Sequence, residues 1–172
     1  VKLNPFGSSE SLCYGMSREI QVGMAAFEGM PHAGFWRGTP ESWTDIHPSW
    51  ALWSEAWDAD GDSIVGEAFA SRDASHATLW SVSSHAAIDL HPSWLKARGS
   101  AARGVCERWQ VGFTWDGGAD HACIWSGTPE SCVDLHPPVA MQSQARAVSG
   151  DVEAGYIVID DVIRAAAWMG TP

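Results

Sequence analysis

Positive charge is scarce in this chain. Its 172 residues include 10 Lys and Arg against 21 Asp and Glu, so the formal net charge at pH 7 is −11. A surface with this balance repels nucleic-acid phosphates and anionic lipid headgroups. We therefore expect no nucleic-acid partner.

Long apolar runs are also missing. No stretch is long and apolar enough to span a bilayer, and none has the pattern of a signal peptide, so we expect no membrane insertion. No window has the apolar spacing of a long amphipathic helix. The apolar residues, 45 % of the chain, instead fall in short runs bounded by Gly, Pro, Asp and Ser, which is typical of β-strands.

Cysteine is sparse and irregularly placed. Cys13, Cys106, Cys123 and Cys132 do not occupy equivalent repeat positions, and none stands in a CxxC motif or at the Cys/His spacing of a structural zinc site. Buried free thiols are the simplest interpretation and favour a cytoplasmic location. A contact between Cys106 and Cys123 is an open alternative.

Internal repetition, by contrast, is abundant. Four segments align without a gap, each beginning with Ser and ending with Gly: 11–23, 54–66, 100–112 and 143–155. Tryptophans follow at intervals of 43 to 45 residues: Trp36, Trp80, Trp125 and Trp168. Each repeat also contains one Asn-Pro or His-Pro pair: Asn4-Pro5, His47-Pro48, His91-Pro92 and His136-Pro137. A repeat of this length with several short strands is typical of β-propeller blades.

Each repeat contains four candidate strands, which in the third unit are 100–105, 109–115, 121–126 and 131–136. We predict an all-β fold, a four-bladed β-propeller with four antiparallel strands per blade. The chain is then a single domain of residues 1–172, with units at approximately 6–48, 49–92, 93–137 and 138–172 plus 1–5. Small residues in the first strand of each unit suit a crowded axis.

The two ends of the chain match two halves of one repeat. Gly170-Thr171-Pro172 matches Gly127-Thr128-Pro129, and Val1-Lys2-Leu3 matches the later Val133-Asp134-Leu135. This match predicts a ring in which the N-terminal strand completes the last blade. Such closure removes an exposed sheet edge.

The repeated His-Ala signature reads HAGFW at His32, HATLW at His76 and HACIW at His121, with RAAAW at Arg164. With the Ser and Gly positions and the V-D-L-x-P segment, it resembles the HAF repeat family, named for a His-Ala-Phe signature. The resemblance covers nearly the whole chain. It implies a propeller-like fold and an extracellular location, and it implies no particular chemistry.

The antiparallel order predicts which side chains share a face. The connections after the second and fourth strands of a blade emerge on the same side. That side receives His32, His76, His121, Arg164 and Asp116, together with Trp50 and Trp94 from the connecting loops. We expect a ligand to bind on this face. We expect the four repeated tryptophans to pack between blades instead.

The repeats differ at one position of the first strand, which holds Tyr14, Trp57, Arg103 and Arg146. This divergence favours a single asymmetric site over four equal ones. The candidate ligand-binding residues are therefore His32, His76, His121, Arg164, Trp50, Trp94, Tyr14, Arg103 and Asp116.

No cofactor is predicted, although two patterns allow a divalent metal. Imidazoles from several blades can converge on one ion, but a residue that every unit repeats is more simply explained by a bond that every unit needs. Asp58, Asp60 and Asp62 resemble the Asp-rich calcium hairpins of integrin-type propellers, whereas an Asp-Gly turn explains them as well.

These features favour a binding module that recognises a small molecule, glycan or protein on the His- and Trp-bearing face. The alternative is an enzyme with one asymmetric pocket on that face, acting on a small aromatic or apolar substrate with Tyr, His and carboxylate groups as acid and base. Multivalent glycan binding would use Trp50 and Trp94 as stacking platforms. No nucleophile elbow and no phosphate-binding loop is present.

Overall fold

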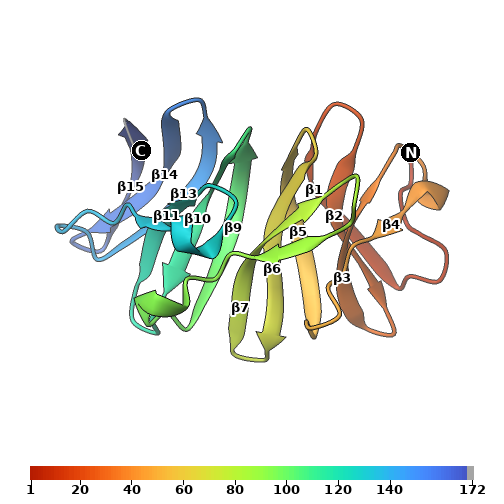
Figure 1. The fold of residues 1–172 in the computed structure, drawn as a ribbon, viewed down its shortest axis with the longest axis horizontal. Coiled ribbons are helices and arrows are strands. Elements are labelled where there is room, and N and C mark those ends of the chain that lie inside the picture. The colour runs from red at the N-terminus through yellow and green to blue at the C-terminus, as the bar shows by residue number, and fades with distance from the viewer. Residues whose placement is uncertain (170–172) are drawn as a thin grey trace.

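The computed structural model describes residues 1–169, which form four antiparallel β-sheets standing side by side (Figure 1). The first sheet contains β1 (Glu10–Met16), β2 (Gln21–Phe27), β3 (Met30–Trp36) and β4 (Thr44–Asp45). The second contains β5 (Trp53–Asp60), β6 (Ser63–Ser71), β7 (Ala74–Ser81) and β8 (Ala87–Asp89). The third contains β9 (Gly99–Cys106), β10 (Trp109–Trp115), β11 (Asp120–Trp125) and β12 (Val133–Asp134). The fourth contains β13 (Gln142–Ser149), β14 (Val152–Ile159) and β15 (Val162–Met169).

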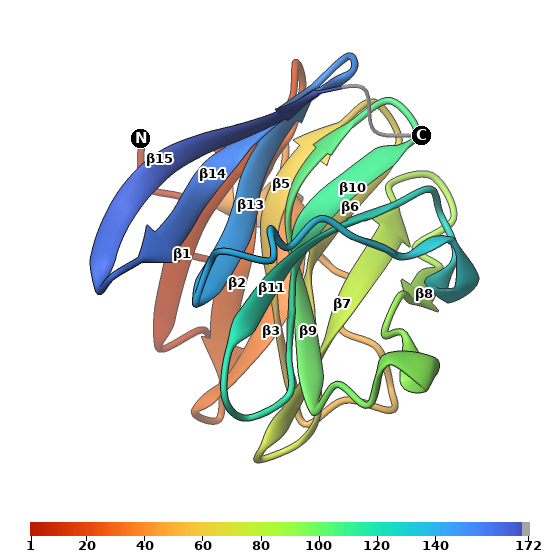
Figure 2. The same cartoon turned by 90° about the vertical axis from the view of Figure 1, so that its left-hand side faces the viewer.

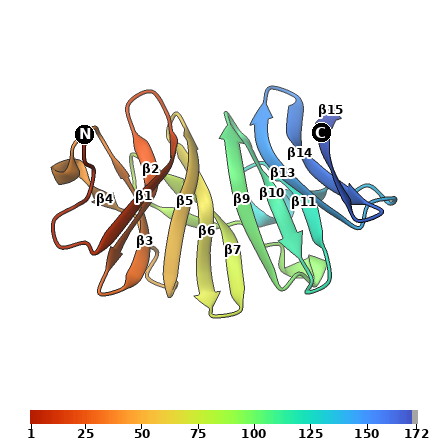
Figure 3. The same cartoon turned by 180° about the vertical axis from the view of Figure 1, so that it is seen from behind.

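Each sheet follows chain order, so every sheet has an inner first strand and, in the first three sheets, a short outer fourth strand. The inner strands β1, β5, β9 and β13 contact one another in sequence along one side of the row (Figure 3). Figure 2 shows β8 as the strand of its sheet farthest from β5. The all-β prediction with antiparallel sheets is confirmed. The described helices are three 3-10 turns of three residues each, and none could cross a lipid bilayer.

The core lies between sheets. Phe35 and Ile46 of the first sheet pack against Ile64 and Trp80 of the second, and similar apolar clusters join the later sheets. Trp36, Trp80 and Trp125 are fully buried, and Trp168 is half-buried. As expected, Trp80, Trp125 and Trp168 fill sheet-to-sheet junctions. Trp36 has no sheet in front of it and is covered by Trp43, whose ring centre lies 4.5 Å away.

The repeated Gly position follows from a β-bulge in every inner strand. The strand pairing skips one residue in β1, β5, β9 and β13, namely Tyr14, Trp57, Arg103 and Arg146. Opposite the bulge, a Cβ on Gly23 would lie 1.9 Å from the Leu12 carbonyl oxygen, and Gly66, Gly112 and Gly155 have the same constraint. Only glycine fits beside so close a backbone. We call the four skipped residues the bulge residues.

The predicted closure of the ring is unconfirmed, because no hydrogen bonds close the row of sheets within residues 1–169. Val1 to Asn4 lie in no strand, the described fourth sheet has three strands, and Val1 and β15 lie at opposite ends of the row (Figure 1). The prediction assumed small side chains at the axis, whereas the bulge residues bring large ones there. Tyr14 stacks on Trp57 with ring centres 4.2 Å apart, and the Arg103 guanidinium lies 4.1 Å from the Trp57 ring. The inner strands nevertheless approach closely, since a Cβ on Gly15 would lie 2.4 Å from the Trp57 carbonyl oxygen of the next sheet.

The repeated tryptophans should dominate stability. We expect Trp125→Ala to lower the free energy of unfolding by about 3 to 5 kcal/mol, because a large aromatic is removed from a site without room for water. Trp94→Ala is the matched control, since this side chain is 46 % exposed on a loop, and it should cost under about 1 kcal/mol. Urea unfolding of both variants measures the difference, and equal losses would contradict it.

Candidate functional site

The predicted histidines belong to a bonding pattern that three sheet junctions share. At the first junction, His32 Nδ1 lies 2.7 Å from the Asp45 carboxylate, which also accepts the backbone N–H of His47. The two imidazoles stack with ring centres 4.2 Å apart. His47 Nδ1 lies 2.8 Å from the Ser54 hydroxyl of the next sheet, and that hydroxyl accepts the backbone N–H of Ala33.

The next two junctions repeat this pattern. The second uses His76, Asp89, His91, Ser100 and Ala77. The third uses His121, Asp134, His136, Ser143 and Ala122. We call each set a junction network.

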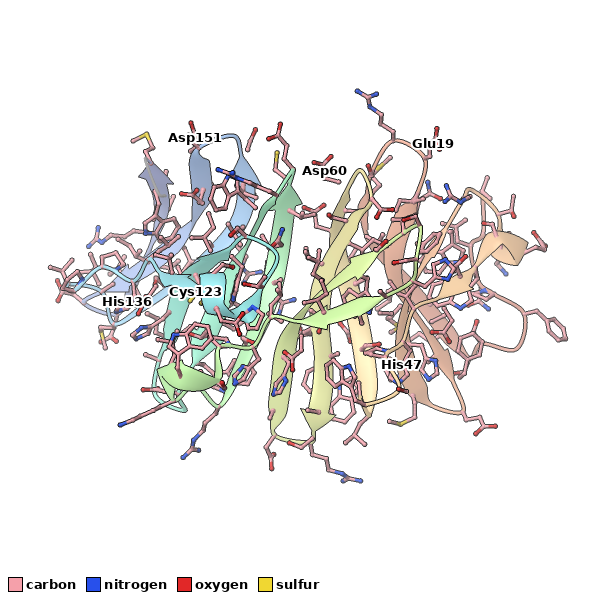
Figure 4. The ribbon with its side chains drawn as sticks, viewed as in Figure 1. Glu19, His47, Asp60, Cys123, His136 and Asp151 are labelled. Carbon is pink, nitrogen blue, oxygen red and sulfur yellow. The ribbon has the colours of Figure 1, made fainter. Side chains whose placement is uncertain are left out.

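The histidines therefore do not converge on one ligand. Each bonds within its own junction, and His47 and His136 lie far apart along the row (Figure 4). Arg164, which takes the histidine position of the fourth sheet, is exposed on β15. Within residues 1–169, no three His, Cys, Asp or Glu side chains gather closely enough to hold a metal ion. Repetition places one copy of this histidine at each junction, where it makes the same bond to an aspartate.

The Asp-rich hairpin has a similar structural role. Asp58 and Asp60 accept the backbone N–H groups of Val105 and Glu107 across the junction with the third sheet, at 3.1 and 2.7 Å. Asp62 instead accepts hydrogen bonds from Ser81 and Ser83. The three carboxylates thus point to different partners rather than to one cation.

The turns at the two ends of the strands lie along opposite edges of the row. The turns after the inner strands, marked by Glu19, Asp60 and Asp151 in Figure 4, lie along one edge, which we call the upper edge. The turns after β2, β6, β10 and β14 lie along the other, the lower edge.

Trp50 and Trp94 are 41 % and 46 % exposed. The Trp50 ring lies 6.0 Å from His76 and lines a pocket of about 420 Å³ with His47. Asp116 and His121 line a smaller pocket of about 140 Å³ with Leu95.

The structure brings two other candidates together on the inner side. Tyr14, Trp57 and Arg103 come from three successive inner strands and form one continuous stack. Arg103 pairs with Glu67 at 3.0 Å, and the Trp57 indole N–H donates to the same carboxylate at 3.2 Å. The fourth bulge residue, Arg146, is exposed and faces Tyr156. We call Tyr14, Glu55, Trp57, Glu67 and Arg103 the inner cluster.

Burial shifts the ionisation of this inner cluster. Burial, followed by the neighbouring Glu67, raises the pKa of Glu55. Burial and the carboxylates of Glu55 and Glu10 raise the pKa of Tyr14 to about 12. Burial lowers the pKa of Arg103. Two half-buried carboxyls beside a tyrosine are costly to fold and are characteristic of functional sites.

A pocket of about 550 Å³ adjoins this cluster at the lower edge, between the first and second sheets. Its lining comes from the β2–β3 turn, the start of β5 and the β6–β7 turn, so it lies on the predicted face. The lining residues are Gly29, Met30, Pro31, Leu52, Trp53, Glu55 and Arg72. Glu55 is the acidic member of this set and also belongs to the inner cluster.

Sequence reasoning missed Glu55 and Glu67. One signal could have found Glu55, because the equivalent positions in the other inner strands hold Leu12, Ala101 and Gln144. An acid in a row of uncharged inner residues stands out.

The contact considered between Cys106 and Cys123 is not the one that the structure shows. All four cysteines are free, and Cys123 contacts Cys132 rather than Cys106. A hydrogen bond to Cys123, together with burial, raises the pKa of the Cys132 thiol.

Comparisons with known proteins place the fold. No family model matches the chain, and no curated protein does. The solved structure of a putative TolB from Agrobacterium tumefaciens is similar, with a TM-score of 0.73 and 13 % sequence identity. The match covers 97 % of this chain and 64 % of that one, so the chain spans less than two thirds of its neighbour's length. The chain has a β-propeller-like all-β fold. At this identity the likeness extends to the fold alone.

The junction networks should make stability depend on pH. Burial and the stacked neighbouring imidazole lower the pKa of His47, His91 and His136 below 6.5, so the folded protein favours their neutral forms. The unfolded chain binds more protons below pH 6.5 than the folded one. The histidines therefore contribute their full share to the free energy of unfolding above pH 6.5. This share is lost as the pH falls from 6.5 to the pKa values that the three histidines have in the folded protein.

Urea unfolding at pH 7.5 and 5.5 measures this loss. We expect His91→Gln to reduce it, since one of the three titrating groups is gone. The exposed His85 lies outside the networks, so His85→Gln should keep the full pH dependence. An unchanged urea midpoint between the two pH values in the parent protein would refute the argument.

Proposed function

We propose that this chain is a binding module that takes a small molecule with an apolar body and a positively charged group in the pocket between the first and second sheets. The observation that carries the proposal is Glu55, a half-buried carboxyl in the lining of an otherwise largely apolar pocket. Ligand pockets are typically apolar with a few placed polar groups that orient the ligand.

The charge of the surroundings supports a cationic ligand. The three carboxylates Glu55, Glu67 and Glu10 outnumber the two cations nearby, Arg103 and the pocket residue Arg72, and the whole chain carries a net charge of −11. Trp53 lines the same pocket, and its ring stacks on Phe69 with ring centres 4.4 Å apart. Aromatic faces and carboxylates together favour organic cations. Arg72 lines the same pocket and suits a ligand that also carries an acceptor group.

The apolar side chains of the pocket are partly exposed to solvent. Leu52 is 45 % exposed and Met30 is 39 % exposed, and both line the pocket. Covering such side chains with a ligand releases about 25 cal/mol for each Å² of apolar surface. The pocket therefore offers both an apolar contribution and a charged anchor.

Benzylamine and benzyl alcohol are matched probes, because they share a ring and differ in charge. We expect the parent protein to bind benzylamine more tightly in calorimetric titration at pH 7.5. Glu55→Gln should weaken benzylamine binding by about 10-fold or more, as for a lost charge-assisted hydrogen bond, and leave benzyl alcohol unchanged. Leu52→Ala should weaken both probes.

Glu41→Gln is the control, since Glu41 is exposed outside the pocket and its loss removes the same charge. Benzylamine affinity should also fall as the pH is lowered through the raised pKa of Glu55. Failure of both probes to bind, or equal effects of Glu55→Gln and Glu41→Gln, would refute the proposal.

A second candidate is an enzyme that uses the same pocket. The specific observation in its favour is that Glu55 lies near Tyr14 and that the pKa values of both groups are raised. A raised pKa makes the Glu55 carboxyl a better proton donor than an ordinary glutamate, while Tyr14 remains a hydrogen-bond donor. Under this alternative, Glu55→Gln abolishes turnover and Tyr14→Phe lowers it, with binding retained in both.

A further inference from the structure

The pocket between the first and second sheets contains charges of both signs. Glu55 lines it from β5, and Arg72 lines it from the turn between β6 and β7. Both walls of the pocket belong to these two neighbouring sheets. A ligand that is only cationic would be attracted by Glu55 and repelled by Arg72, so the presence of Arg72 calls for a second, negatively charged group on the ligand.

The two charged groups do not neutralise each other. Among residues 1–169, Arg72 forms no ion pair, and its side chain is exposed. Arg103, and not Arg72, is the cation that lowers the pKa of Glu55, as expected if Arg72 lies on the far side of the pocket. Each group can therefore bind a ligand group of the opposite charge.

The strand register separates the acid from the base. Glu55 lies opposite Glu67 in the β5–β6 ladder, and β6 continues from there to Ser71, directly before Arg72. At a rise of about 3.3 Å per residue, the backbones that carry the two charged groups lie roughly 13 Å apart along the strand. Trp53, opposite Phe69 in the same ladder, falls between them.

The surface between the two charges is apolar. Leu52 and Trp53 form it from the second sheet, and Met30 and Pro31 form it from the first. An amino acid carries its ammonium group and carboxylate on one carbon atom, so it cannot reach both Glu55 and Arg72. Each further residue of a peptide adds at most about 3.6 Å, so about two or three residues are needed to bring the two ends of a ligand to both groups.

We propose that the pocket binds a short apolar peptide with free ends, its ammonium group at Glu55 and its carboxylate at Arg72. This assignment rests on the proposed function, because it keeps Glu55 as the anchor for a cation. A guanidinium suits the carboxylate, since its planar fork donates two parallel hydrogen bonds. The apolar side chains of the peptide cover Leu52 and Met30, and the reversed orientation would place each end against a group of its own charge.

Three related peptides test the two ends separately. Leucyl-leucine has both charges, leucyl-leucine amide lacks the carboxylate, and N-acetyl-leucyl-leucine lacks the ammonium group. In calorimetric titration at pH 7, where α-amino groups are mostly protonated, we expect leucyl-leucine to bind about 10-fold more tightly than either blocked peptide. Leucine and leucine amide should bind with equal affinity, because a single residue is too short to reach Arg72.

Substitution of Arg72 tests the carboxylate end. Arg72→Gln should make the affinities of leucyl-leucine and its amide equal, and Arg72→Glu should reverse their order, because the carboxylate is then repelled. The side chain is exposed on a turn, so both variants should fold, which circular dichroism checks. Arg18→Gln is the matched control, since Arg18 is exposed on the upper edge and its loss changes the net charge equally. This variant should keep the preference of the parent protein.

The outcomes separate this proposal from the one on which it rests. If benzylamine and leucyl-leucine amide bind the parent protein but the free carboxylate adds no affinity, the cation site stands and the peptide assignment is overturned. The assignment is also overturned if leucine gains as much from its carboxylate as leucyl-leucine does, or if the preference for leucyl-leucine survives Arg72→Gln. If neither benzylamine nor leucyl-leucine amide binds, the cation site itself is refuted, and the peptide assignment with it.

Discussion

The rest of the structure depends on one buried hydroxyl at each junction between sheets. The serines of β5, β9 and β13 are fully buried, and each accepts a backbone N–H from the preceding sheet while bonding an imidazole of the same network. A buried hydroxyl is tolerated only when its hydrogen bonds are satisfied, so this serine fixes where neighbouring sheets meet. The Ser, His-Pro and Asp positions repeat together because they form one bonding unit.

Because the junction networks fix how neighbouring sheets meet, the residue type at each bulge can vary. Each bulge directs one side chain toward the inner side without changing the strand ladder, so its residue type is not dictated by packing. Tyr14, Trp57 and Arg103 differ for this reason, and they stack into a single asymmetric cluster. The residues of the junction networks are repeated in the sequence, whereas the residues of the inner cluster differ from one repeat to the next.

The fold class and the inner three strands of each repeat could be predicted, because alternation and turn residues reflect local backbone requirements. In the third repeat, the expected 109–115 strand is β10 itself, while the expected outer strand of 131–136 shrinks to β12, Val133–Asp134. The side chain of Asp134 bonds the His136 N–H and ends that strand, which no strand propensity reveals. Closure of the ring could not be predicted, since it depends on the angle between neighbouring sheets and not on the pattern of any single strand. Tyr14 and Arg103 were found through their divergence, but Glu55 matters because of neighbours from other strands.

The short outer strands have a consequence for how these molecules behave in a crowded solution. β4 and β12 have two residues each and β8 has three, so the outer flank of the first three sheets presents very few unpaired backbone groups in a row. A long, flat flank would template the addition of strands from other chains, whereas these fragments are too short to do so. The flank therefore resists amyloid-like stacking without needing charged or proline residues at every position. Sequence variation along the outer strands can consequently be broad, provided that the aspartate of each junction network remains.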